Sequence, residues 1–545
     1  MIETPFPNQP PPFEGRNLFG TDVALQEALS AAGTTSECAE VGRWGETLGS
    51  AETFALADAA NDNPPRLRTH DARGERIDVV EFHPAWDALM RLATAVGEHC
   101  APWTEAGGNA QVVRAAMYFL HAQVENGTQC PLTMTYASVP VLRDHAGSNP
   151  MIGEVWLPRL LARDHDPRPL PIAAKRAALI GMGMTERQGG SDVRSNLTRA
   201  ESNPDGTWRL RGHKWFFSAP QCDGHLVLAQ AAEGLSCFLL PRFLDDGTRN
   251  TVQINRLKDK LGNRSNASSE VEFHDAVAWR IGDPGRGIVT ILAMVQHTRL
   301  DCVIGSAGMM RGALARALHH AAHRVAFGRR LTEQPLMMTV LADIALEVEG
   351  ATTLALRLAR MFETHAGEPD RALARVMTPA AKYWVCKRAP MVALEAMEVL
   401  GGNGYVEETP LARLYREAPV NSIWEGSGNV ICLDVMRAAR REPAALDALF
   451  AELDQARGAN RDLDAFATSL RGRSRNTDDQ SSARQIAQAI ALAFTASLLV
   501  RCAPAFVADA FCASRLRNHA FTGSAFGTLP PDCQTDALIR RASGE

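Results

Sequence analysis

Apolar residues recur at every third or fourth position along most of the first 180 residues. Residues 85–99 (AWDALMRLATAVGEH) and 111–125 (QVVRAAMYFLHAQVE) show this spacing most clearly. It places the apolar side chains on one face of an α-helix. Prolines at Pro64–Pro65 and around residues 167–171 mark loops between helices. The pattern predicts an N-terminal α-helical domain over residues 1–180.

The pattern of apolar residues changes between residues 181 and 286. Short apolar runs such as residues 207–218 (TWRLRGHKWFFS) and the alternating stretch 270–273 (EVEF) are separated by turn residues. One such turn is residues 203–206 (NPDG), whose side chains tolerate tight backbone geometry. Short alternating runs bounded by turns are typical of β-strands. Residues 181–286 are therefore predicted to form a middle β-domain.

Helical spacing returns in long segments over residues 287–440, which predicts a helical bundle. Residues 441–545 are helical in pattern again and are expected to form an additional C-terminal helical domain. The expected fold class is α+β. A chain of 545 residues also requires more than one domain, because single hydrophobic cores stop growing near roughly 250–300 residues.

The composition of the chain excludes several classes of protein. The chain is 46% hydrophobic and 22% charged, which excludes collagen-like, low-complexity and wholly disordered proteins. Eleven cysteines, without a CxxC pair, suggest neither a disulfide framework nor a zinc site. The proline-rich start lacks the basic and apolar segments of a secretory signal, and the apolar stretch 489–500 is too short to span a bilayer. We expect a cytoplasmic protein without a membrane span.

Two motifs have features of a metal site or a dinucleotide-binding site. His319 and His323 could share a helix face as a metal pair, but a helical surface or subunit contact is the better interpretation because no HExxH pattern or acidic third ligand accompanies them. Gly181 and Gly183 begin a GxGxxG-like run, but Glu186 replaces its third glycine and no βαβ unit surrounds it. Neither a metal site nor a Rossmann domain is predicted.

Five segments, in the same order along the chain, resemble signature segments of the acyl-CoA dehydrogenase superfamily. They are residues 182–193 (MGMTERQGGSDV), 212–218 (GHKWFFS), 324–328 (RVAFG), 401–405 (GGNGY) and 424–429 (WEGSGN). The resemblance implies an acyl-CoA dehydrogenase-like fold, an oxidoreductase activity and FAD as the cofactor. The residues that it implies as flavin contacts are Met182, Met184, Thr185, Gly190, Ser191, Phe216, Phe217, Ser218, Arg324, Phe327, Gly401, Gly402, Asn403, Ile423, Trp424, Ser427 and Asn429.

Glu425 is the candidate catalytic base. Removing the α-proton of a thioester requires a carboxylate in a dry pocket, and Trp424 supplies an apolar wall while Gly426 allows close approach of a ligand. Without the motif, a solvated loop carboxylate would be the simpler interpretation. Other branches of the family carry the base on the helix before a TR-like pair, where this chain has Thr298-Arg299 and no glutamate. Arg299 is either a substrate-channel residue or an ordinary helix-face arginine.

Longer stretches, such as residues 256–273 and 416–438, resemble a branch of the superfamily that is linked to the bacterial response to alkylation damage. That resemblance implies that the tail of about 100 residues helps to bind double-stranded DNA, with arginines on phosphates. The tail contains no lysine and about as many acidic residues as arginines, so intersubunit ion pairs are the alternative role. The predicted DNA contacts are Arg437, Arg440, Arg441, Arg471, Arg473, Arg475, Arg515 and Arg517; Arg484 was also considered.

The expected function is an FAD-containing, acyl-CoA dehydrogenase-like protein of the alkylation response that binds and protects DNA and weakly dehydrogenates short branched acyl-CoA. The alternative is an ordinary metabolic acyl-CoA dehydrogenase without a role on DNA. An acyl-CoA or an alkylating small molecule is the expected small ligand. The family resemblance also implies a homotetramer, in which Arg324 and the Gly401–Gly402 turn reach the flavin of a neighbour.

Overall fold

The computed structural model describes residues 8–34, 37–105, 108–147, 149–474, 479–517 and 525–544. The chain divides into two compact units. The first, called the helical unit below, comprises Met1–Phe54, Gly107–Val124 and Leu300–Glu545. The second, the sheet unit, comprises Ala55–Ala106 and Glu125–Arg299.

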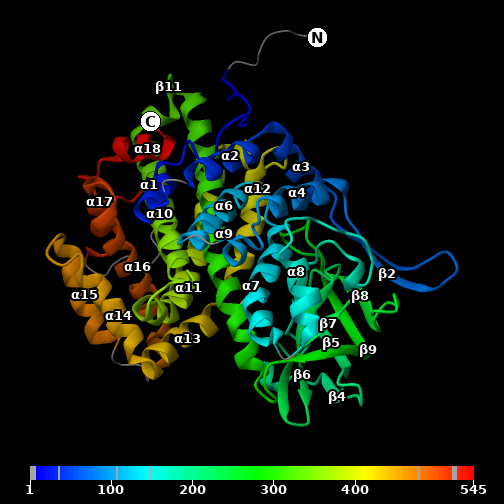
Figure 1. The fold of residues 1–545 in the computed structure, drawn as a ribbon. Coiled ribbons are helices and arrows are strands. Elements are labelled where there is room, and N and C mark those ends of the chain that lie inside the picture. The colour runs from blue at the N-terminus through cyan, green and yellow to red at the C-terminus, as the bar shows by residue number, and fades with distance from the viewer. Residues whose placement is uncertain are drawn as a thin grey trace, which may run out of the picture. The chain divides into compact units, whose positions relative to one another are not determined.

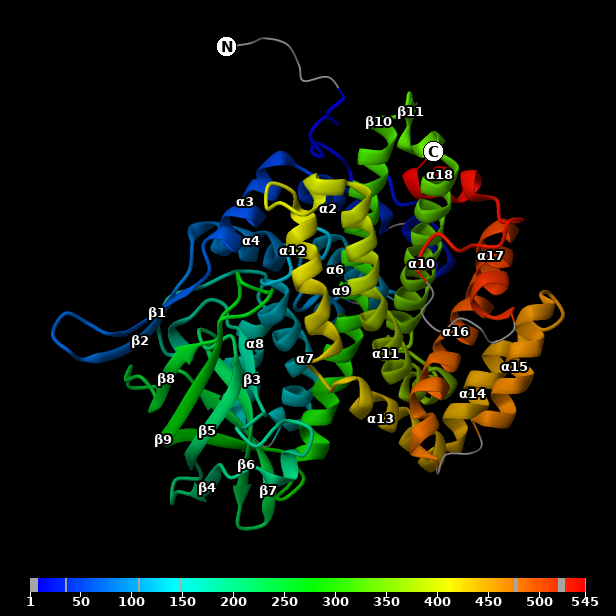
Figure 2. The same ribbon diagram turned by 180° about the vertical axis from the view of Figure 1, so that it is seen from behind.

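A seven-stranded sheet forms the centre of the sheet unit. The strands lie in the order β3-β5-β4-β6-β7-β9-β8, and further pairings of β3 with β6 and of β5 with β9 close the sheet on itself (Figure 2). The bounds are β3 (Ile180–Gly183), β4 (Arg199–Ser202), β5 (Trp208–Ser218), β6 (Gly224–Ala231), β7 (Gly234–Pro241), β8 (Val252–Leu257) and β9 (Ser268–Ile281). Most neighbours are antiparallel, whereas β3 and β4 pair with β6 in parallel.

Strand alternation fills the interior of this sheet with apolar side chains. Leu210, Phe217, Val227, Phe238 and Phe273 belong to one buried cluster, because every second residue of a strand points to the same face. The predicted turn at residues 203–206 joins β4 to β5, where Gly206 has φ +85°. The β-strands expected from alternation are therefore present over residues 180–281.

Helices complete the sheet unit. They are α4 (Pro84–Ala95), α5 (Ala101–Thr104), α7 (Gln129–Ala146), a π-helical turn (Met151–Trp156) and α8 (Leu157–Leu160). The prediction of helices throughout residues 1–180 overlooked a hairpin formed by β1 (Arg66–His70) and β2 (Arg76–Glu81). Its first strand alternates exposed and half-buried side chains, a short pattern that is hard to separate from a polar loop.

The helical unit is built from helices that lie side by side (Figure 1). They are α1 (Val23–Ala31), α2 (Cys38–Leu48), α6 (Ala110–His121), α10 (Pro335–Arg360), α11 (Glu368–Val399), α12 (Pro410–Glu417) and α13 (Gly428–Arg441). Helix α9 (Gly287–His323) begins in the sheet unit and enters this unit at Leu300. A Cβ on Gly308 of α9 would lie 2.3 Å from the carbonyl oxygen of Phe119, so glycine permits the close approach of α9 to α6.

The C-terminal extension packs directly on the bundle helices and lies in the same compact unit. Its helices are α14 (Pro443–Asp454), α15 (Arg461–Arg473), α16 (Ala483–Cys502), α17 (Ala505–Arg515) and α18 (Thr535–Ser543). Figure 2 shows α14, α15 and α16 beside one another, and α16 contacts α10, α11 and α13.

Two segments, α9 and Gln480–Cys502, are long and apolar enough to cross a membrane by length and composition. However, 61% and 72% of their most apolar windows are buried inside the protein, as expected for core helices.

Candidate functional site

A buried ion pair anchors the loop that follows β3. The carboxylate of Glu186 lies 2.8 Å from the ammonium of Lys214 on β5, and neither side chain is exposed. Glu186 also accepts hydrogen bonds from the backbone N–H groups of Leu197 (2.6 Å) and Thr198 (3.2 Å), while Lys214 donates to the carbonyl of Leu228 at 2.7 Å. These bonds tie both ends of the loop to the sheet.

Burial and the opposite charges of Glu186 and Lys214 shift the pKa values of both groups. Burial by itself would raise the pKa of Glu186, but the charge of Lys214 and the hydrogen bonds lower it below the usual value. Burial lowers the pKa of Lys214 to about 8, against the opposing effect of Glu186. A buried pair with this many hydrogen bonds holds the loop in one conformation.

The anchored loop presents polar groups that the sequence motif predicts to contact a ligand. Thr185 is half-buried, and its carbonyl accepts a hydrogen bond from the N–H of Trp215 at 2.8 Å. A Cβ on Gly190 would lie 2.4 Å from the hydroxyl oxygen of Thr185, so any larger residue at this position would displace that hydroxyl. Ser191 is exposed, Met184 is half-buried and Met182 is 8% exposed.

The last residues of β5 face opposite sides of the sheet. Phe216 is 49% exposed and Ser218 is half-buried, whereas Phe217 is only 2% exposed. The ammonium of Lys258 lies 4.6 Å from the centre of the Phe216 ring. Phe216 and Ser218 therefore form the available face, and the prediction that Phe217 contacts the flavin is wrong, because strand alternation turns its side chain into the core.

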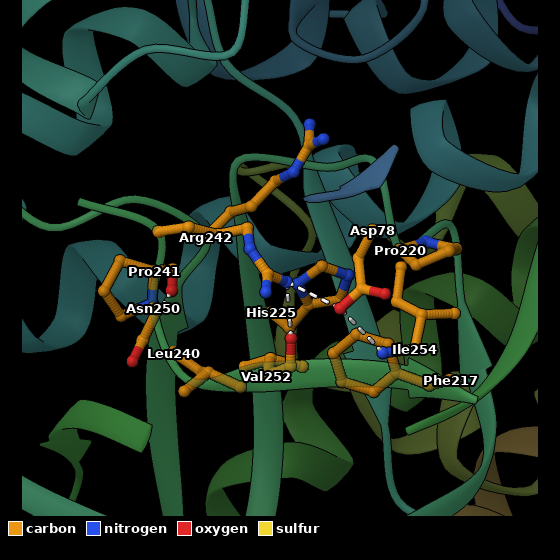
Figure 3. A pocket seen from close by; sticks show the side chains of 11 residues that line it. Asp78, Phe217, Pro220, His225, Leu240, Pro241, Arg242, Asn250, Val252 and Ile254 are labelled. Atoms are coloured by element: carbon orange, nitrogen blue, oxygen red, sulfur yellow. Dashed lines mark hydrogen bonds and ion pairs between the residues drawn. The ribbon is translucent and has the colours of Figure 1, made fainter. Parts of the chain in front are cut away.

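Phe217 borders a small internal cavity of about 30 Å³ (Figure 3). Its ring stacks on His225 with centroids 4.1 Å apart, and burial lowers the pKa of His225 to about 3. Across the cavity, the carboxylate of Asp78 accepts from Arg249 at 2.7 Å and from the N–H of Ile254 at 3.3 Å. A space of this size holds about one water molecule and no cofactor.

In the helical unit, the candidate base lies in a tightly held turn between η6 (Ala418–Ser422) and α13. Glu425 has φ +56°, a left-handed conformation that is unfavourable for a residue with a side chain. The ammonium of Lys382 on α11 donates to the carbonyls of Trp424 (2.8 Å) and Gly426 (2.5 Å), on either side of Glu425. The indole N–H of Trp424 donates to Asn421 at 2.8 Å. The glutamate is thus held in a strained conformation by its surroundings.

The other predicted contacts of this turn are accessible. Ile423 is 63% exposed, and Ser427 and Asn429 are exposed at the start of α13. Asn429 accepts a hydrogen bond from Arg484 of α16 at 2.9 Å. The C-terminal extension therefore reaches the catalytic segment directly, which was not predicted.

Arg324 and Phe327 lie at a short hairpin after α9, formed by β10 (Val325–Ala326) and β11 (Arg329–Arg330). Phe327 has φ +53° and is fully exposed. Asn8 holds the hairpin in place. Its side-chain amide donates a hydrogen bond to the carbonyl of Val325 at 2.8 Å, and its backbone carbonyl accepts one from the guanidinium of Arg324 at 2.7 Å.

The glycine-rich turn after α11 forms η5 (Gly401–Gly404). Gly401, Gly402 and Asn403 are exposed, and a Cβ on Gly401 or Gly402 would meet no described atom within 4 Å. The backbone of this turn is therefore open to a large ligand. Arg299 on α9 is 5% exposed, which excludes the interpretation as a surface arginine on the helix.

Three segments of the chain match models of protein families. Residues 8–167 match "Adaptive response protein AidB N-terminal domain", residues 181–276 match "Acyl-CoA dehydrogenase, middle domain", and residues 285–440 match "Acyl-CoA dehydrogenase, C-terminal domain". The chain is also 47% identical over 98% of both sequences to the putative acyl-CoA dehydrogenase AidB of Escherichia coli. The chain belongs to the acyl-CoA dehydrogenase family, and within it to the AidB branch.

Other members of the acyl-CoA dehydrogenase family agree with this assignment. Acyl-CoA dehydrogenase family member 11 of Caenorhabditis elegans is 32% identical, over 76% of this chain and 69% of its own. The crystal structure of C. elegans ACDH-11 in complex with C11-CoA superimposes with a TM-score of 0.87 at 28% identity, covering 95% of this chain and 94% of that one. The AidB-like chain is thus an FAD-dependent, acyl-CoA dehydrogenase-like oxidoreductase, as the five motifs predicted.

Three residues that support these acyl-CoA dehydrogenase motifs were missed from the sequence: Glu186, Lys214 and Lys382. Glu186 was noted only because it breaks a glycine pattern. Lys382 interrupts an apolar stretch of α11, and a lone charge in such a run was an available signal. Lys214 follows Arg209 and Arg211 in β5, so its charge did not stand out in the sequence.

The tail arginines of this AidB-like protein differ in environment. Arg515 is 3% exposed and pairs with Asp343 (2.5 Å) and Glu347 (3.2 Å), so its predicted DNA contact is wrong because the side chain is committed to the protein interior. Three arginines form ion pairs with acidic side chains and stay partly exposed: Arg437, Arg471 and Arg517. Arg473 is half-buried, whereas Arg440 and Arg441 are exposed at the end of α13. Arg475 lies outside the described residues.

Proposed function

We propose that this protein is an FAD-containing member of the alkylation-damage response that weakly dehydrogenates short branched acyl-CoA thioesters and binds double-stranded DNA. The observation that carries the enzymatic part is the conformation of Glu425, a carboxylate held at φ +56° by hydrogen bonds to the carbonyls on both sides of it. Strain of this kind is maintained where function requires one orientation of a side chain.

In the proposed reaction, Glu425 removes the α-proton of the thioester, and the β-carbon loses a hydride, which leaves a double bond between the two carbons. FAD, when bound, supplies the acceptor for the hydride and its two electrons. Trp424 and Glu425 are both half-buried, so the indole ring and the bound substrate together would limit water around the base while it removes the proton.

The described residues fit a flavin. In the sheet unit, the exposed face of Phe216, with Ser218, Thr185 and Ser191, offers an aromatic surface beside hydroxyl groups. In the helical unit, the open backbone of Gly401–Gly402 suits a pyrophosphate, and Arg324 suits its charge. We propose that the last two act on the cofactor of a neighbouring copy in a homotetramer.

The enzymatic proposal is tested by anaerobic titration of the FAD-loaded protein with straight and branched acyl-CoAs of increasing length. We expect slow bleaching of the visible flavin band, fastest with a short branched thioester. A flavin that no acyl-CoA in the panel bleaches would contradict the proposal. An alkylating agent in place of the thioester tests whether that class of small molecule is the ligand.

The DNA-binding part is supported by the exposed arginines at the end of α13 and by the likeness to an adaptive-response protein. Arg440 and Arg441 are exposed on the protein surface, and phosphate contacts from them would give binding with little base preference and a steep dependence on salt. We place this function in the cytoplasm.

Removing the tail is a poor test of DNA binding, because Arg515 and Arg484 connect the tail to the bundle and to the catalytic segment. The double variant Arg440→Gln/Arg441→Gln is better, with Arg360→Gln/Arg371→Gln in the bundle as a control of equal charge. In gel shifts at several salt concentrations, we expect the first variant to reduce the salt slope by about 0.9 per lost phosphate contact, and the control to leave it unchanged. Equal slopes for both variants would contradict the proposal.

An ordinary metabolic acyl-CoA dehydrogenase is the second candidate. The ion pairs that Arg471, Arg515 and Arg517 form within the chain favour it, because they give those arginines a structural role. Rapid bleaching by one acyl-CoA, together with no shift of duplex DNA at low salt, would decide for it.

A further inference from the structure

Lys382 is a buried lysine beneath the catalytic turn. It lies in the middle of α11, and its side chain is 1% exposed. Its ammonium donates to the carbonyl of Trp424 at 2.8 Å and to that of Gly426 at 2.5 Å. We propose that Lys382 is the positioning residue for Glu425, the residue that fixes where the base stands. The inference rests on the proposed function of Glu425.

The two accepting carbonyls explain why one lysine can orient the base. They belong to the residues immediately before and after Glu425, so the ammonium fixes the chain on both sides of it. Glu425 adopts a left-handed φ of +56°, and Gly426 follows with φ +105°. Such a turn relaxes readily unless its surroundings hold it, because residues with a Cβ disfavour this region. Two bonds from a charged donor are stronger than bonds from neutral groups.

The side chain of Trp424 is held separately. Its indole N–H donates to Asn421 at 2.8 Å, and the amide of Asn421 donates to the hydroxyl of Ser306 on α9 at 3.0 Å. Helix α9 therefore holds the ring, while α11 holds the backbone. Of the anchors that the described residues show, only Lys382 binds the backbone on both sides of Glu425.

Lys382 also contributes charge where it is buried. The thiol of Cys302 on α9 has its pKa raised by burial, lowered by Lys382 and raised by Glu425, so both charges act on the same thiol. The ammonium and the carboxylate therefore occupy the same small region around Cys302. Loss of the ammonium would leave two partly buried carbonyls without this donor, and the turn would rearrange to regain partners.

The test compares Lys382→Met with Lys387→Met, which removes an exposed lysine five residues further along the same helix. Both are loaded with FAD and mixed with the best acyl-CoA substrate in single-turnover experiments. For Lys382→Met we expect a fall of roughly 10²-fold in the rate constant of flavin reduction, a larger isotope effect with α-deuterated substrate, and unchanged substrate affinity. Lys387→Met should behave as the wild type.

These readouts separate positioning from stability. A purely structural role would lower the amplitude, because fewer molecules are folded, but not the rate constant of the folded ones. Lys382→Gln keeps one neutral donor and should recover part of the rate; it also replaces the Met variant if that variant does not retain FAD. A rate constant and isotope effect equal to the wild type in either variant would overturn the inference.

Hydrogen exchange gives a test that needs no substrate. We expect the peptide around residues 421–430 to exchange faster in Lys382→Met than in Lys387→Met. Equal exchange would overturn the inference even if acyl-CoA reduces the flavin. If exchange rises as expected but the wild type is reduced by no acyl-CoA, the proposed function fails instead, and Lys382 holds a turn with another role.

Discussion

The carboxylate of Glu186 and the ammonium of Lys214 lie 2.8 Å apart, and both side chains are fully buried. The pair connects the loop after β3 to strand β5, the two segments of the sheet unit that carry the predicted flavin contacts. Lys382 has the corresponding role in the helical unit, where it holds the turn of Glu425. Each set of functional residues is thus supported by a buried lysine.

Breaking the ion pair of Glu186 and Lys214 should lower the free energy of unfolding strongly. Lys214→Met leaves Glu186 charged and unpaired in the interior, and we expect a loss of about 3–5 kcal/mol in the free energy of unfolding. Arg211→Met, which breaks the exposed pair with Asp275, should change the stability little, because solvent screens this pair. Urea denaturation measures both values. Similar losses for the two variants would contradict the structural role of the buried pair.

The same pair predicts a dependence of stability on pH. The pKa of Glu186 is lower in the folded protein than its ordinary value of 4.5, so its ionisation stabilises the fold above pH 4.5. That contribution is lost as the pH falls through the lowered value. The variant Glu186→Gln carries no such proton, and its stability should therefore fall less steeply below pH 4.5 than that of the wild type. Parallel curves from denaturation at several pH values would refute this.

Phe216 and Phe217 provide a contrast between neighbours. Phe217→Ala removes a buried ring and should cost about 3–5 kcal/mol of stability with FAD binding intact in the folded fraction. Phe216→Ala removes a half-exposed ring, so we expect little change in stability and about a tenfold weaker affinity for FAD. Thermal unfolding and flavin titration distinguish the two, and reversed phenotypes would show that the faces of β5 are misassigned.

Arg515 tests whether the extension is part of the core. Arg515→Met leaves Asp343 and Glu347 short of a partner, and we expect about 3–5 kcal/mol of destabilisation, against at most about 1 kcal/mol for Arg517→Met at the surface. Chemical denaturation of both variants gives the comparison. An unchanged midpoint for Arg515→Met would mean that the tail is only loosely attached.

The sequence predicted the order of helical and β segments, because long 3.6-residue periods and short alternating runs are strong signals. It also located the five motifs and Glu425. It could not show that Phe217 faces the core, since the motif carries three adjacent aromatic residues and only the register of β5 decides which of them face the core. Nor could it distinguish Arg515 from Arg440, because charge alone does not reveal which arginine meets buried acids at Asp343 and Glu347.

Glu425 is the residue that we propose removes the substrate proton. The most direct measurement is the rate of flavin reduction by acyl-CoA in a single turnover, for the wild type, Glu425→Gln and the control Glu408→Gln at an exposed glutamate. We predict that Glu425→Gln retains FAD and binds acyl-CoA but reduces the flavin about 10²–10⁴-fold more slowly, while the control matches the wild type. Reduction of the flavin by Glu425→Gln at the wild-type rate would show that Glu425 is not the base.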